Sequence, residues 1–207
     1  AADFEELGCE LRYDLVTTYC LTPDTANPDS PLADQRVREA IEYAINKEAI
    51  ASALSYGYWG APYQIPGPAT VAYNPDFTLG RKYDPEKAKQ LLAEAGYANG
   101  LDITIICIPL SLNKDVDAAI QADLKKVGIN ATLEFPEAAK WQSYNTQGWK
   151  NALVFQPFAG FPNFNYTLQF YWAPTSVNNK SWLRTPEFLE AYEKSLTSPE
   201  PDPALMR

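Results

Sequence analysis

Histidine is absent from the 207 residues, and its absence limits the chemistry that this sequence can perform. Serine–histidine and cysteine–histidine nucleophile systems, histidine general bases and histidine-ligated zinc are all impossible within these residues. The cysteines Cys9, Cys20 and Cys107 have no Cys-x-x-Cys spacing, which argues against a zinc knuckle and a dithiol redox site. A disulfide between Cys9 and Cys20 stays open. We expect no metal and no cofactor, and a pair of carboxylates is the catalytic arrangement that remains.

Aromatic side chains are the candidates for binding chemistry. Eleven of the 27 aromatic residues fall between Trp141 and Trp172. They can fill a core and an interface with a further lobe, or several of them can wall a cleft and stack on a ligand. Because Pro157 and Pro162 interrupt any helix, we expect a strand here, followed by an irregular segment.

Charge and composition exclude several classes of protein. The formal net charge is −9 and the isoelectric point is about 4.6, so the surface repels phosphates and nucleic acid is not an expected partner. No apolar run reaches the roughly 18 residues of a membrane span. A hydrophobic content of 46% is enough for a real core, and we expect residues 1–207 to form a single domain.

Residues 31–50, PLADQRVREAIEYAINKEAI, predict the helix that anchors this domain. Asp34 is a good N-cap, so the helix should begin near Gln35. A long ordered loop packed by aromatic residues should follow over residues 57–83. The apolar positions of the helix recur at three- and four-residue steps and should share one buried face, namely Val37, Ala40, Ile41, Ala44, Ile45, Ala49, Ala53 and Leu54.

The remaining pattern alternates between strands and helices, which predicts an α/β fold with a mixed, largely parallel sheet and helices on both faces. In such sheets ligands bind beyond the carboxyl ends of the strands, here residues 108–112, 135–137 and 156–161. The expected strands are residues 11–21, 101–108, 129–135 and 151–156, and the further expected helices are residues 84–96, 114–127, 137–147 and 185–196.

Three segments resemble one family in its order of motifs. Residues 31–50, residues 83–97 (YDPEKAKQLLAEAGY) and residues 117–129 (DAAIQADLKKVGI) resemble the extracellular solute-binding proteins of ABC importers, in the peptide- and nickel-binding class, family 5. The resemblance implies one lobe of a type II periplasmic binding protein, of the C-terminal type. It also implies that a second lobe and any leader lie outside these residues.

The resemblance implies where a ligand would bind. In peptide binders of this family an aspartate after the last strand holds the ligand's ammonium group, and this sequence has Gly160 there, with Asn163 in place of a second acid. An unpaired buried ammonium would be costly, which favours recognition of uncharged parts of a ligand. The candidate ligand-binding residues are Trp141, Tyr144, Gln156, Phe158, Gly160, Phe161 and Asn163.

The expected function is capture of a peptide or other small solute outside the cell and its delivery to a membrane permease, without catalysis. The protein would be extracellular or periplasmic, with a lipid anchor as an option. Binding of an oligosaccharide, and a sensing or adhesion role without transport, remain alternatives. A carbohydrate-active enzyme with two carboxylates is a further alternative. Half of a two-lobed site should bind weakly by itself.

Overall fold

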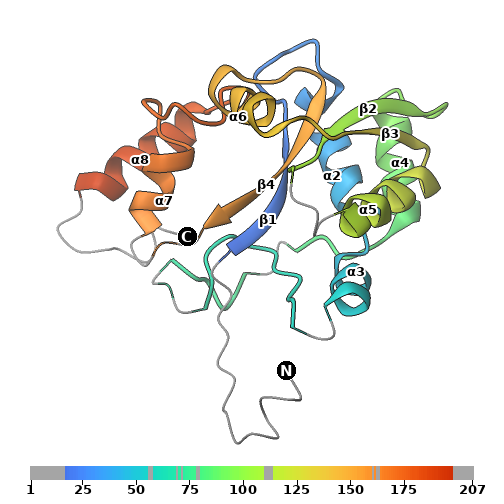
Figure 1. Cartoon of the computed structure of the whole chain (residues 1–207), viewed down its shortest axis with the longest axis horizontal. Coiled ribbons are helices and arrows are strands. Elements are labelled where there is room, and N and C mark those ends of the chain that lie inside the picture. The colour runs from blue at the N-terminus through green and yellow to red at the C-terminus, as the bar shows by residue number, and fades with distance from the viewer. Residues whose placement is uncertain are drawn as a thin grey trace, which may run out of the picture.

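A mixed sheet forms the centre of the fold (Figure 1). The computed structural model describes residues 17–55, 58–68, 70, 72–77, 80–109, 114–159, 161 and 164–197. Within them the strand order is β1-β4-β2-β3, with β1 antiparallel to β4 and the other pairs parallel. The strands are β1 (Thr17–Pro23), β2 (Leu101–Ile106), β3 (Ile129–Glu134) and β4 (Ala152–Ala159). The predicted α/β class is confirmed.

Helices cover both faces of the sheet. The connection from β2 to β3 and the connection from β3 back to β4 run in opposite directions, so crossovers of the usual hand lie on opposite faces. One face packs against α2, α4 and α5 in the main hydrophobic core, and the other carries α6. These helices are α2 (Gln35–Ala44), α4 (Pro85–Glu94), α5 (Lys114–Lys126) and α6 (Ala138–Gln147).

Two of the predicted helix starts are confirmed by their caps. The Asp34 side chain accepts a hydrogen bond from the Arg36 N–H, and the Asp84 side chain accepts one from the Lys87 N–H. A short 3-10 turn, η1 (Pro31–Ala33), precedes α2. No helix among the described residues is long and apolar enough to cross a membrane.

The anchor helix is shorter than predicted, because the chain breaks at Ile45 and restarts as α3 (Lys47–Leu54). Ile45 is extended, with φ −98° and ψ 119°. The Asn46 N–H donates to Asp123 Oδ2 of α5 at 2.9 Å, while Asn46 Oδ1 accepts from the Ala49 N–H. Since α3 takes a new direction, Ala49 and Ala53 are exposed. The prediction of a single buried face is therefore wrong beyond Ile45.

The segment after β4 is also not irregular throughout. Residues Phe164–Tyr171 form α7, and a further helix, α8 (Pro186–Thr197), follows. Pro162 precedes α7 and so does not interrupt it. Strand β4 itself runs to Ala159, three residues beyond the predicted end, so the expected irregular chain is replaced by a longer strand and a helix.

The described residues between α3 and α4 contain no helix or strand and are held by side chains. The Tyr63 hydroxyl donates to Glu48 Oε1 at 2.5 Å, and Lys47 Nζ lies 4.1 Å from the centre of the Tyr63 ring. A Cβ on Gly80 would come within 2.7 Å of that ring. Arg81 forms ion pairs with α2. These contacts fix the passage against α2 and α3.

A buried carboxylate ties β1 to β4. Asp24, only 1% exposed, accepts hydrogen bonds from the Asn151 N–H at 2.9 Å and the Asn27 N–H at 3.3 Å. Asn151 has a φ of 51°, a conformation that needs such support outside glycine. The Asp24 carboxylate therefore holds the turn that leads into β4.

Replacing Asp24 with alanine should lower the free energy of unfolding by about 2 to 3 kcal/mol, because charge-assisted hydrogen bonds are lost and a buried N–H is left unpaired. Urea denaturation of the protein that carries this chain measures the change. Asp29→Ala is the matched control, since Asp29 is exposed. Equal decreases in the free energy of unfolding of the two variants would show that the Asp24 hydrogen bonds do not stabilise the fold.

Candidate functional site

Strand β4 has an open edge at its carboxyl end. It pairs with β1 from Leu153 to Ala159, but with β2 only from Ala152 to Val154. From Phe155 onward the edge that faces away from β1 has no strand partner among the described residues. Pro157 lies in this half, where a missing N–H is tolerated best. The missing strand partner does not expose this half of β4, because Phe155, Gln156 and Phe158 are at most 5% exposed and the Ala159 N–H donates to the Tyr171 hydroxyl at 3.4 Å.

The open edge lies where the topology predicts a binding crevice. Strand β2 is followed by α5 on one face, whereas β4 is followed by α7, which packs through the cluster around Phe158 on the other face. Neighbouring strands whose connections diverge in this way leave a crevice outside their carboxyl ends. Figure 1 shows β4 continuing beyond β2 and ending beside α7.

Two of the predicted site residues, Trp141 and Tyr144, lie on α6. The Tyr144 hydroxyl donates to Glu134 Oε1 at 2.8 Å, and Lys140 Nζ donates to the same oxygen at 2.7 Å. The bonds from Lys140 and Tyr144 hold the pKa of Glu134 below its ordinary value. Trp141 packs on both sheet clusters, and its buried indole N–H has no acceptor among the described residues. Glu134 at the end of β3 is thus already neutralised within the fold.

Gln156 and Phe158 are buried within β4 and engaged by protein groups. Gln156, 3% exposed, donates through Nε2 to Thr22 Oγ1 at 2.8 Å and to Asn179 Oδ1 at 2.7 Å. The Phe158 ring, 2% exposed, stacks on Trp172 with centroids 5.1 Å apart. Both side chains therefore make their contacts inside the protein. Contact of either side chain with a ligand stays a prediction.

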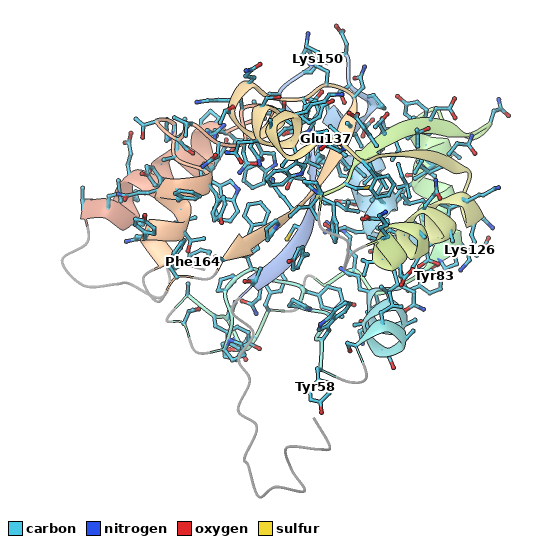
Figure 2. The ribbon with its side chains drawn as sticks, viewed as in Figure 1. Tyr58, Tyr83, Lys126, Glu137, Lys150 and Phe164 are labelled. Carbon is cyan, nitrogen blue, oxygen red and sulfur yellow. The ribbon has the colours of Figure 1, made fainter. Side chains whose placement is uncertain are left out.

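Phe161 joins the end of β4 to α7. Its N–H donates to Thr167 Oγ1 at 3.3 Å, and its half-buried ring meets the Tyr166 ring edge-on at 4.7 Å. Figure 2 shows Phe164 at the start of α7, next to the end of β4. The structure therefore places Phe158 in the cluster beside α7 and Phe161 against Tyr166 of α7, whereas Trp141 and Tyr144 belong to a separate cluster. Gly160 and Asn163 lie outside the described residues, and their roles stay predictions. Cys9, which the open disulfide question concerns, also lies outside them.

Sequence reasoning missed the exposed face of α7. Tyr166 is 51% exposed and Phe170 is 45% exposed, one helical turn apart. The inward positions Phe164, Thr167 and Tyr171 recur at three- and four-residue steps, a helical signal that the nearby prolines obscured. Asn179, fully buried, was missed because nothing local marks it as the partner of Gln156.

A cavity of about 240 Å³ lies on the other side of α7 and is separate from the open edge of β4. It contains none of the predicted site residues. Its lining is mostly apolar, with Gln64 and Asn74 as polar members, and comes from three parts of the chain that include Ile65, Phe77, Phe164, Trp172 and Phe188.

An unpaired carboxyl group lies behind the carboxyl end of β2. Asp117, in the first turn of α5, is 1% exposed, and neither of its oxygens has a hydrogen-bond partner among the residues that the structure describes. Burial raises the pKa of Asp117 to about 6, although the neighbouring Cys107 acts in the opposite direction. The Cys107 thiol itself donates to the Ile105 carbonyl, at 3.6 Å. Ionisation of Asp117 near neutral pH therefore lowers the stability of the folded protein.

The fold is that of a type II periplasmic binding protein. The structure superposes on HbpA2 from Haemophilus parasuis with a TM-score of 0.82 and 24% identity, covering 95% of this chain and 40% of that one. It superposes on the periplasmic binding protein DppA from Helicobacter pylori, in complex with peptide STSA, with a TM-score of 0.75 and 25% identity, covering 92% of this chain and 38% of that one.

The sequence model of the bacterial extracellular solute-binding proteins, family 5, matches residues 11–179, so the chain belongs to this family. It is 36% identical to the dipeptide-binding protein of Escherichia coli K12 over 132 residues, which are 58% of this chain and 24% of that protein. It is also 36% identical to heme-binding protein A of Haemophilus influenzae over 131 residues, 60% of this chain and 23% of that protein. The matches thus span about a quarter of these relatives' length.

Asp117→Asn should stabilise the protein at pH 7.5 by about 1 to 3 kcal/mol, because the folded pKa of about 6 exceeds the ordinary value of 3.8. A raised folded pKa favours the native state below pH 3.8, and this advantage is lost as the pH rises through 6. The benefit of the substitution should therefore shrink toward pH 4. Urea denaturation at both pH values measures the change in the free energy of unfolding. Asp115→Asn, which changes an exposed aspartate on the same helix, is the control. A benefit independent of pH would contradict burial as the cause.

Proposed function

We propose that this chain is one lobe of the substrate-binding component of an ABC importer. It captures a peptide or other small solute outside the cell and presents it to a membrane permease, and it performs no catalysis. The observation that carries the proposal is the match of residues 11–179 to family 5 of the extracellular solute-binding proteins. The binding proteins among its relatives support the absence of catalysis.

The open edge of β4 supports a site that is completed by a second lobe. Beyond Val154 the strand has no partner on the side of β2 among the described residues, and the chain that follows it presents the half-exposed rings of Tyr166 and Phe170. A ligand enclosed between two lobes can contact these rings while water is excluded. Residues 1–207 would act as a single domain within the larger protein. An anchor in the membrane, through a lipid, would keep the lobes close to the permease.

The proposal predicts that the full-length protein retains a small solute. Native mass spectrometry of the protein, purified without denaturation, should show a ligand-bound mass that disappears after unfolding and refolding. Re-adding the released fraction should restore that mass and raise the melting temperature, because the ligand binds only the folded state.

The isolated lobe is the control for this experiment. Residues 1–207 alone should bind the same fraction at least about a hundredfold more weakly, because half of the contacts are missing while most of the entropic cost remains. Micromolar affinity of the isolated lobe would contradict a two-lobed site. Conversion of the retained solute into a product would contradict a transport function.

A further inference from the structure

The part of the chain that forms the end of β4 and α7 carries no formal charge. From Asn151 to Asn179 the sequence has no Asp, Glu, Lys or Arg, although these residues make up 21% of the whole chain. The run extends over all of β4 and all of α7. A charged group of a solute would find no counter-charge among the residues of this run, and burying it against them would be costly.

Three aromatic rings form a continuous row on this uncharged wall. The Phe161 ring lies 4.7 Å from the Tyr166 ring, and the Tyr166 ring lies 6.4 Å from the Phe170 ring at an interplanar angle of 21°. Tyr166 and Phe170 are about half exposed. Between them Gln169 presents an exposed amide on the same helix. The row begins at Phe161, two residues beyond the end of β4.

The row is supported from within the protein. The Phe170 ring meets Tyr171 edge-on at 4.8 Å, Tyr171 meets Phe158 at 4.8 Å, and Phe158 stacks on Trp172. The Tyr171 hydroxyl also lies 3.4 Å from the Ala159 N–H, which donates to it. Rings held in this way lose little further entropy when a ligand stacks on them.

Resting on the proposed function, we propose that Tyr166 and Phe170, with Phe161 edge-on beside them, form a stacking platform for an uncharged, hydroxyl-rich ring, so that the solute is a neutral oligosaccharide. The apolar C–H face of a sugar ring packs on an aromatic face, whereas its hydroxyl groups need amide partners such as Gln169. Neither contact requires a charge on the protein.

The test uses the full-length protein and a panel of probes in isothermal titration calorimetry. The panel contains neutral di- to tetrasaccharides (cello-, malto- and xylo-oligosaccharides) and, for comparison, tri- and tetra-alanine with free termini. We expect at least one saccharide to bind and the alanine peptides not to bind. The double variant Tyr166→Ala/Phe170→Ala should weaken saccharide binding by about tenfold or more, since each aromatic contact contributes roughly 0.5 to 1.5 kcal/mol.

A further variant separates stacking from a general effect of removing a surface ring. Trp59→Ala, which removes an equally exposed ring elsewhere, should bind within about threefold of the parent. Binding of the peptides but not the saccharides, unchanged in the double variant, would overturn the platform and leave the importer proposal standing. A double variant that loses thermal stability without losing saccharide affinity would identify the face as an interface with the second lobe and also overturn it. Failure of every probe, together with no retained solute, would overturn both proposals.

Discussion

The unequal pairing of β4 is the constraint on which the rest of this structure depends. On one side β1 follows the strand along nearly its whole length, and on the other β2 stops after three residue pairs. The first arrangement holds β4 in place along its length, and the second leaves its carboxyl-terminal half without a strand partner on the side of β2 among the described residues. Side chains fill that side, since Phe155, Gln156 and Phe158 are at most 5% exposed. The point at which β2 ends therefore allows the chain after β4 to leave the sheet and form α7.

Holding β4 in this position requires polar groups that are buried and satisfied. Gln156 bridges Thr22 on β1 and Asn179 in the segment before α8, and all three are at most 3% exposed. Such a network fixes a unique arrangement because each donor has one acceptor at the right distance, whereas apolar contacts tolerate sliding. Uncharged partners suffice, so the support of the wall adds no formal charge at the crevice.

The elements that the sequence predicted well are those with local signals. Asp34 and Asp84 mark helix starts through their own side chains, and alternating apolar residues mark the strands. The break at Ile45 depends on a hydrogen bond from Asn46 to Asp123, 77 positions away, which no local pattern contains. Likewise the partners of Gln156 lie 134 and 23 positions away. Helix α7 is a different case, because its apolar residues do show a helical period. We nevertheless expected irregular chain there because Pro162 precedes it.

Charge distribution decides how such a wall can discriminate between solutes. The chain as a whole carries −9, and this field acts on a charged solute mainly at long range and is screened within about 8 Å at physiological salt. The run from Asn151 to Asn179 adds no formal charge at the end of β4, and Glu134 at the end of β3 is already bound by Lys140 and Tyr144. Selection at the wall must therefore come from contacts of short range, namely ring stacking, shape and backbone hydrogen bonds. These contacts reach full strength only when water is excluded, and closure by a second lobe would exclude it.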